Sequence, residues 1–263
     1  MKNLQHKKLI VFDLDGTLAP SKSVMDGEMS RLFDKLLSRK KVAVIGGGRY
    51  SLFKTQLLKP LRELKTRKEL LANLSLFPTT ATAFYRYDRG WKNVYIKNLS
   101  KGERAKIKKA FLTVFKETHY EHPKKVYGPL IEDRGTQVSF SVFGQNIVAV
   151  LGKKGIRMKD EWRRKNTPLK LKLAKLVQKR LPELEVHAAG YTTIDVTRKG
   201  IDKAYGMKQI EKYLRTPIKD MVFIGDALFP GGNDYAVKKT GVQAIPVKGP
   251  EETKKIIREI IKA

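Results

Sequence analysis

The sequence predicts an α/β fold, with a parallel sheet whose strands alternate with helices and with an inserted α+β segment. Two apolar runs, residues 9–12 and 221–224, are typical of buried strands, and an aspartate lies at or just beyond the end of each. Helical patterns separate these and the other apolar runs, as expected for a parallel sheet. After about residue 83 the pattern changes to hairpins and longer helices, which indicates a separate insert.

The individual elements follow from local patterns. Apolar runs mark strands, residues recurring every three or four positions mark helices, and glycine and proline mark their ends. For the sheet-forming part we expect strand 8–13, helix 26–39, strand 42–45, helices 49–59 and 61–72 divided at Pro60, strand 74–77, strand 191–197, a helix from Lys203, strands 221–225 and 242–247, and helix 251–262.

The insert is expected to contain two hairpins and two helices. The hairpins fall at 85–96 and 126–143, and Ser100 and Glu103 form a capping box before the first helix. Thr167-Pro168 is expected to start the second helix, since proline is favoured at a first helical position. We therefore expect a core formed by 1–83 and 191–263, and a cap domain at 84–190.

Composition narrows the class of protein. The chain has 263 residues, 41% of them hydrophobic, which is enough for one or two packed domains. It contains no cysteine, which excludes disulfides, thiolate metal sites and cysteine nucleophiles. No apolar run approaches the length of a membrane span, and the first residues lack the pattern of a signal peptide. We expect a cytoplasmic enzyme without a membrane partner.

The formal net charge of +29 is the most unusual bulk property. Such a charge attracts phosphorylated small molecules and also nucleic acid. A lysine-rich solvated surface explains it more simply, because no nucleic-acid-binding motif accompanies it.

Asp13 and Asp15, in Phe12-Asp13-Leu14-Asp15-Gly16-Thr17, carry the strongest chemical signal. They follow a buried strand, and ligands bind at the carboxyl ends of strands in open α/β sheets. One carboxylate can attack phosphorus and the other can give and take a proton. The alternative is a pair of aspartates that merely cap a turn.

Two further motifs complete a recognisable order. Lys203 follows Gly200-Ile201-Asp202, and residues 225–234 read Gly-Asp-Ala-Leu-Phe-Pro-Gly-Gly-Asn-Asp. Together with Asp13 and Asp15 they resemble the haloacid dehalogenase (HAD) superfamily, in particular its phosphomannomutase-like branch. The resemblance covers almost the whole chain. It implies a Rossmann-like core with a type IIB α+β cap, Mg²⁺ as cofactor, and a homodimer formed through the cap.

The resemblance also implies roles in the core. Asp13 is the expected nucleophile, Asp15 the acid and base, and Lys203 the cation that bridges nucleophile and phosphoryl group. Asp13, Asp15 and Asp226 would hold Mg²⁺, Asp15 through its main-chain carbonyl. Asp234 is expected in the ligand shell, or alternatively as a helix cap.

Substrate contacts are expected around the glycine turn and in the cap. The superfamily keeps a hydroxyl where this chain has Gly46 or Gly48, so main-chain N–H groups beside Gly47, Gly48 and Arg49 are expected to hold the phosphoryl group. Arg134, Thr193 and Asp195 match phosphate- and hydroxyl-binding residues of phosphomannomutases, and Asn233 is expected to fix its loop. Alternatively, Arg134 is an ordinary arginine in a hairpin turn and has no role in binding. Another arginine of that branch falls near Gln145 and is missing.

Three functions remain after these observations. We favour a Mg²⁺-dependent phosphohydrolase of phosphomannomutase-like build acting on a small sugar phosphate. The alternative is a phosphomannomutase that interconverts mannose 1-phosphate and mannose 6-phosphate. A lesser alternative is a nucleic-acid-associated phosphatase that uses the basic surface.

Overall fold

A computed structural model describes residues 4–262 of the chain. The chain divides into two compact units, each with its own internal contacts. Met1–Ile96 and Asp202–Ala263 form the first unit, and Lys97–Ile201 forms the second. Within the described residues, no helix is both long enough and apolar enough to cross a membrane.

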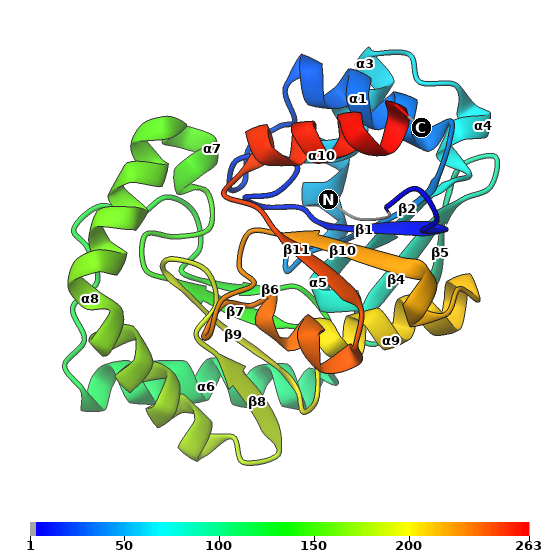
Figure 1. Ribbon diagram of the computed structural model, residues 1–263. Helices are drawn as coiled ribbons and strands as arrows, with labels where there is room; N and C mark the ends of the chain where they lie inside the picture. The colour runs from blue at the N-terminus through cyan, green and yellow to red at the C-terminus, as the bar shows by residue number, and fades with distance from the viewer. Residues whose placement is uncertain (1–3, 263) are drawn as a thin grey trace. The chain divides into compact units, whose positions relative to one another are not determined.

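A seven-stranded sheet forms the centre of the first unit (Figure 1). Its strands are β1 (Leu9–Asp13), β2 (Lys41–Ile45), β3 (Leu74–Phe77), β4 (Ala83–Tyr87), β5 (Trp91–Ile96), β10 (Met221–Gly225) and β11 (Gln243–Pro246). They lie in the order β11-β10-β1-β2-β3-β4-β5. The first five in that order are parallel, and β4 and β5 add an antiparallel edge.

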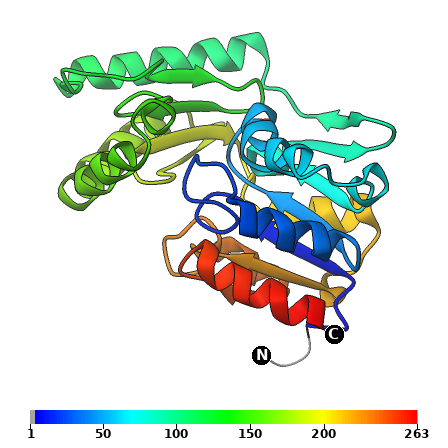
Figure 2. The same ribbon diagram turned by 90° about the horizontal axis from the view of Figure 1, so that it is seen from above.

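Helices cover both faces of this sheet. The helices α1 (Gly27–Leu37) and α10 (Pro250–Lys262) lie side by side on one face, and α9 (Lys203–Leu214) covers the other (Figures 1 and 2). Alternate residues of β1 serve the two faces, with Ile10 in the core under α1 and α10 and Leu9 in the core under α9. Burial on both faces explains why the parallel strands are continuous apolar runs.

Shorter segments connect these elements. The α2 helix runs through a π-helical turn into α3 without interruption. The segments are α2 (Tyr50–Phe53), the π turn (Lys54–Leu58), α3 (Lys59–Glu63), α4 (Lys68–Leu71), α5 (Pro78–Ala81) and 3₁₀ turns at Ile218–Asp220 and Tyr235–Thr240.

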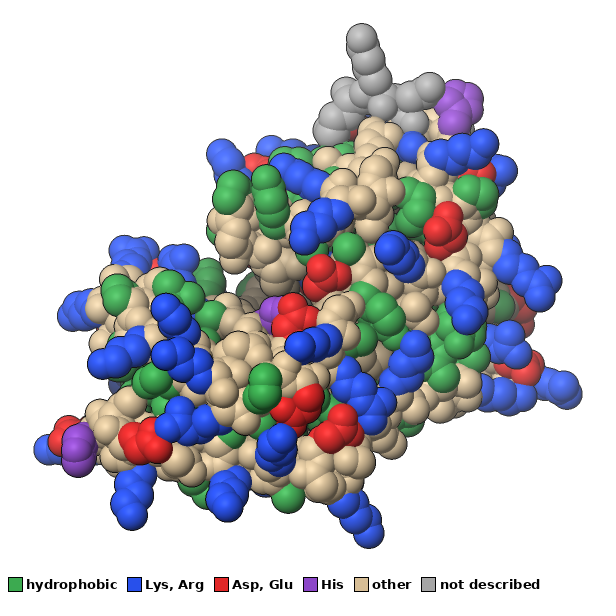
Figure 3. Space-filling model, turned by 90° about the horizontal axis from the view of Figure 1, so that it is seen from below, with side chains coloured by type: hydrophobic (Ala, Val, Ile, Leu, Met, Phe, Trp, Pro, Cys, Tyr) green, Lys and Arg blue, Asp and Glu red, His purple; other side chains and the backbone are tan. Residues whose placement is uncertain are grey.

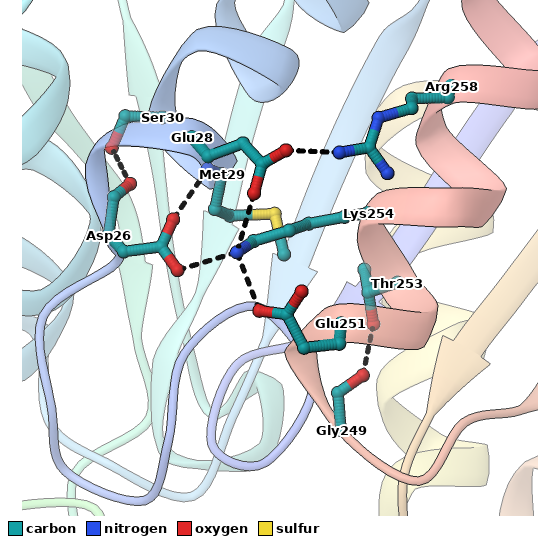
Figure 4. A network of polar contacts seen from close by, with 9 residues as sticks. All are labelled: Asp26, Glu28, Met29, Ser30, Gly249, Glu251, Thr253, Lys254 and Arg258. Atoms are coloured by element: carbon teal, nitrogen blue, oxygen red, sulfur yellow. Dashed lines mark hydrogen bonds and ion pairs between the residues drawn. The ribbon is translucent and has the colours of Figure 1, made fainter.

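An ion-pair network joins α10 to the start of α1 (Figure 4). The Nζ of Lys254 lies 2.7 Å from Asp26 Oδ2, 2.6 Å from Glu251 Oε1 and 3.0 Å from Glu28 Oε2. Asp26 also caps α1, because its side chain accepts a hydrogen bond from Met29 N at 2.8 Å. Lys254 is only 3% exposed, and such a buried cation is tolerated because carboxylates surround it.

The second unit is a four-stranded antiparallel sheet covered by helices. Its strands, in spatial order, are β6 (Ile131–Asp133), β7 (Val138–Ser141), β9 (Thr193–Arg198) and β8 (Leu184–His187). The helices α6 (Lys101–Glu117) and α8 (Lys153–Arg180) pack on the sheet around Phe111, Phe140 and Val177, and α7 (Ile147–Leu151) precedes α8. The capping box of Ser100 and Glu103 starts α6, as expected.

Several expected elements are corrected by the structure. The helix expected from Thr167 begins at Lys153, with Pro168 in its interior. Pro168 has no N–H to donate to the carbonyl of Arg164, and Thr167 Oγ1 donates to the neighbouring carbonyl of Arg163 at 2.7 Å. Pro60 does not end a helix either, because it lies in the first turn of α3.

The two division points also differ from the expected ones. Residues 84–96 belong to the first unit because β4 pairs with β3. Residues 191–201 belong to the second unit because β9 pairs with β7 and β8. The boundaries therefore fall after residues 96 and 201, where the sequence indicated 83 and 190.

Candidate functional site

Three aspartates meet at the carboxyl ends of two adjacent strands of the first unit. Asp13 is the last residue of β1, and Asp226 follows the last residue of the neighbouring β10. Asp234, which is fully buried, comes from the loop after β10. One carboxylate oxygen of each aspartate lies within 4.8 Å of those of the other two.

Lys203 supplies a cation to this acidic cluster. It is the first residue of α9, whose N-cap Asp202 accepts from Tyr205 N at 2.8 Å. Its Nζ donates to the Oδ1 atoms of both Asp13 and Asp234, and the side chain is 2% exposed. The helix start expected at Lys203 therefore brings its ammonium between two of the predicted carboxylates.

Asp234 does not act as a helix cap, which was the alternative from the sequence. Its side chain makes no capping hydrogen bond to the 3₁₀ turn that follows. Instead Oδ2 accepts from Ala227 N at 3.0 Å while Oδ1 contacts Lys203. The carboxylate thus lies within the cluster and fixes the loop that carries Asp226.

Two glycines allow the carboxylates to approach the backbone closely. Gly16 has φ +86°, and a Cβ there would overlap the carboxylate of Asp226. A Cβ on Gly225 would overlap the carboxylate of Asp234. The Asp-Gly and Gly-Asp pairs of the two motifs therefore have a steric reason.

The electrostatics of the cluster show an excess of negative charge. Burial raises the pKa of Asp13, Asp234 and Asp226 raise it further, and Lys203 opposes them. Burial and the charge of Asp234 raise the pKa of Asp226 to about 6. For Lys203, burial works to lower the pKa, but the carboxylates of Asp13 and Asp234 outweigh burial and raise it.

One ammonium group cannot neutralise three carboxylates, so a divalent cation would offset the remaining charge. The available donors are carboxylate oxygens, which are the ligands that Mg²⁺ prefers. The residues present therefore fit such an ion.

Asp15 is held by two residues that the sequence did not single out. Its Oδ1 accepts hydrogen bonds from the main-chain N–H of Lys22 and from Gln56 Nε2, the latter at 3.0 Å. Gln56 lies in the π turn, a feature with no sequence signature. Its contact with Asp15 spans 41 positions of the chain, so only the folded structure reveals it.

The glycine turn is fixed by a left-handed segment. The carbonyls of Gly46 and Gly48 accept from Thr80 N and Thr79 N, both at 2.9 Å. Both threonines have positive φ, a conformation that is costly for a non-glycine residue. Gly47 lies within this turn, Arg49 is the N-cap of α2, and Asn233 is exposed in the loop after β10. Phosphate binding at these positions stays a prediction.

A second group of predicted residues is connected within the second unit. Arg134 contacts Glu132 Oε2 at 2.7 Å through Nε and Gln145 Oε1 at 3.1 Å through one NH₂ group. Gln145 Nε2 donates to the carbonyl of Ser139 at 3.2 Å, and the Ser139 hydroxyl donates to Asp195. Arg134 and Asp195 thus belong to one network, and the guanidinium is fixed by partners. Gln145, noted only as a missing arginine, is the link between them.

Other cations lie near this network. Arg163 stacks over the ring of Tyr191 at 4.6 Å from the ring centroid. Lys170 is 6% exposed and donates to the carbonyl of Gly190 at 2.8 Å. Burial lowers the pKa of Lys170, and the charge of Arg163 lowers it further. Thr193, which was expected to bind substrate, donates its hydroxyl to the carbonyl of Ala189 at 2.6 Å.

The remaining basic residues do not gather in one place on the face drawn in Figure 3. There, Lys and Arg side chains are scattered between apolar, polar and acidic ones. Such a pattern is typical of a solvated surface.

The chain is similar to known proteins in sequence and in fold. A family model described as haloacid dehalogenase-like hydrolase matches residues 10–237. A phosphomannomutase of Encephalitozoon cuniculi is 25% identical over 97% of this chain and 94% of its own length. One from Saccharomyces cerevisiae is 25% identical over 96% and 93%. Among solved structures, a truncated Plasmodium falciparum IMP-nucleotidase shares the fold with a TM-score of 0.68, at 15% identity over 98% of this chain and 68% of its own.

Proposed function

Because this chain belongs to the haloacid dehalogenase-like hydrolases, we propose that it is a Mg²⁺-dependent hydrolase of a small sugar phosphate. The observation that carries the proposal is the buried cluster in which Lys203 lies between Asp13 and Asp234, beside Asp226. Such a cluster combines a carboxylate nucleophile, a fixed cation and oxygen ligands for a metal.

The first half of the reaction transfers the phosphoryl group to the protein. A carboxylate oxygen of Asp13 forms a bond to phosphorus while the bond to the sugar oxygen breaks. Protonated Asp15 gives its proton to that oxygen, so the sugar leaves as an alcohol. Lys203 stabilises negative charge on the transferring group.

The second half releases phosphate. Asp15, now ionised, takes a proton from water as the water oxygen attacks phosphorus, and the carboxylate of Asp13 is restored. Asp13, Asp226, Asp234 and the main-chain carbonyl of Asp15 would hold Mg²⁺, which when bound supplies positive charge to the phosphate oxygens.

We assign substrate recognition to the second unit and phosphoryl positioning to the glycine turn. Main-chain N–H groups beside Gly47, Gly48 and Arg49 would hold the transferring phosphoryl group. Asn233 would fix the conformation of the loop after β10. In the second unit, Arg134 would bind a distal phosphate, and Thr193 and Asp195 would bind sugar hydroxyls. The relatives named phosphomannomutase support a sugar phosphate as substrate.

A mutase is the second candidate, because those relatives match this chain over nearly its whole length. A mutase must return the phosphoryl group to a second sugar oxygen and hold a distal phosphate in both orientations. Gln145 in place of a cation, and Gly46 or Gly48 in place of a residue with a hydroxyl, favour hydrolysis.

³¹P NMR separates the two candidates. The protein is mixed with Mg²⁺ and mannose 1-phosphate, with and without a trace of hexose 1,6-bisphosphate. We expect inorganic phosphate; a bisphosphate-dependent hexose 6-phosphate signal would instead mean a mutase. Asp13→Asn should abolish either signal, whereas Asp88→Asn, at a half-exposed hairpin position, should not. No turnover of any hexose or pentose phosphate would refute the proposal.

A further inference from the structure

Gln56 contacts both ends of the loop that carries Asp15. Its Nε2 donates to Asp15 Oδ1 at 3.0 Å. Its main-chain carbonyl accepts from Met25 N at 3.0 Å. One residue of the π turn therefore holds the loop near its start and near its end, and it is itself only 1% exposed.

Packing alone does not explain a glutamine at this position. Its Oε1 is buried and, among the residues that the structure describes, has no hydrogen-bond partner. A buried polar atom without a partner is destabilising, and an apolar side chain of similar size avoids that cost. The π turn itself is a rare local structure that is frequent at functional sites.

We infer that Gln56 is a positioning residue for Asp15. A carboxyl oxygen that bears no proton only accepts hydrogen bonds, and the NH₂ side of the Gln56 amide faces such an oxygen. Gln56 Nε2 and Lys22 N both donate to Oδ1, and these two hydrogen bonds fix the orientation of the carboxyl group. This inference rests on the proposed function, in which Asp15 gives a proton to the leaving oxygen.

Leaving-group dependence tests the inference. Gln56→Met removes the donor and keeps the volume. A hexose phosphate needs a proton on its leaving oxygen, whereas 2,4-dinitrophenyl phosphate does not. For Gln56→Met we expect kcat/KM, which reports the steps up to phosphoryl transfer, to fall at least about tenfold for the hexose phosphate and less than about threefold for the aryl ester. Asp15→Ala should show the same selectivity, and adding Gln56→Met to it should change nothing further.

A matched control separates positioning from folding. Gln137 is also 1% exposed but lies in the second unit, and Gln137→Met should not alter the ratio of the two substrates. Equal losses on both substrates, or additive effects with Asp15→Ala, would overturn the role of Gln56 alone. A wild-type protein inactive on both substrates would overturn the proposed function and this inference with it.

NMR provides a readout that does not need turnover. The side-chain amide signals of Gln56, identified by their loss in Gln56→Met, should shift in Asp15→Ala and not in Asp88→Asn. Unshifted signals would contradict the contact.

Discussion

Single residues control how much negative charge the acidic cluster can hold. Asp13 and Asp234 share the ammonium group of Lys203, while Asp226 lies at the edge with a pKa raised to about 6. The cluster also requires glycine at position 16. Only glycine adopts its positive φ without strain and leaves room for the carboxylate of Asp226.

Gly16→Ala should therefore cost more than backbone strain. Gly241 is the matched control, since it also has positive φ (+77°) but nothing lies within 4 Å of an added Cβ. Gly241→Ala should lower the free energy of unfolding by about 1–2 kcal/mol and leave activity unchanged. Gly16→Ala should lose more stability and also displace Asp226, so kcat/KM should fall at least about tenfold. Urea unfolding measures the stability of the two variants, and phosphate release measures their activity. Equal losses of stability and activity in the two variants would contradict the steric argument.

Arg134→Ala should reveal whether the second unit binds the distal part of the substrate. We expect KM for a hexose bisphosphate to rise about tenfold or more, because a charge-assisted contact is lost. KM for a small aryl phosphate, which carries no distal phosphate, should stay within about twofold. Arg164→Ala, at an exposed ion pair with Asp160, is the control. Equal changes for both substrates would argue against this role.

Among single residues, the sequence predicted the positions of those that lie at the end of a strand or at the start of a helix. Asp13, Asp226 and Lys203 could be placed because apolar runs and a helix start locate them. Gln56 and Lys22 could not, because a π turn and a main-chain donor leave no pattern. The sequence singled out Gln145 only because related proteins have an arginine near this position. Its contact with Arg134 could not be predicted, because it forms only when the chain has folded.

Among the elements, the buried strands were the easiest to predict. Their apolar runs face two cores, and β1, β2, β3 and β10 appear where expected. The start of the long helix α8 differs from the prediction because proline usually marks a helix boundary, and here Pro168 lies in the helix interior. The hairpin of β4 and β5 was found, but its partner β3 decides which unit it joins, and local patterns cannot show that.

The capping box of α6 predicts a pH-dependent stability. Hydrogen bonds from Arg198 and from the main-chain N–H of Ser100 lower the pKa of Glu103 to about 2, below its ordinary value of 4.5. The stabilisation is thus complete above about pH 4.5 and is lost as the pH falls towards 2. Since both partners are partly exposed, Glu103→Gln should cost about 1 kcal/mol at pH 7 and almost nothing near pH 2.

Urea unfolding of wild type and variant across this pH range measures the difference. Glu121→Gln, at an exposed loop position, should show no such trend. A difference that does not depend on pH would show that the ion pair contributes nothing.

At the scale of the whole molecule, the described residues build three hydrophobic cores, two on the two faces of the first unit's sheet and one in the second unit. The second unit has its own buried cluster, and Arg198, near its end, contacts Glu103, near its start, at 3.0 Å. The sequence indicated an insert from its change of pattern. The division points depend on pairing between distant strands, so they came only from the structure.

A fragment of residues 97–201 should therefore fold alone. We expect dispersed amide NMR signals and cooperative urea unfolding, with an m-value of about 1–2 kcal/mol/M. Phe140 is fully buried in the cluster, and Phe140→Ala should remove about 3–5 kcal/mol and unfold most of the fragment. A wild-type fragment whose amide NMR signals are not dispersed would mean that the second unit needs the first unit in order to fold.

As the proposed nucleophile, Asp13 carries the phosphoryl group during turnover. The enzyme is denatured while it turns over a sugar phosphate with Mg²⁺, and borohydride then reduces any aspartyl phosphate to homoserine. Mass spectrometry of the peptides identifies the position. We expect homoserine at position 13 and none at 15, 226 or 234. Homoserine at another aspartate, or sustained turnover without any, would contradict it.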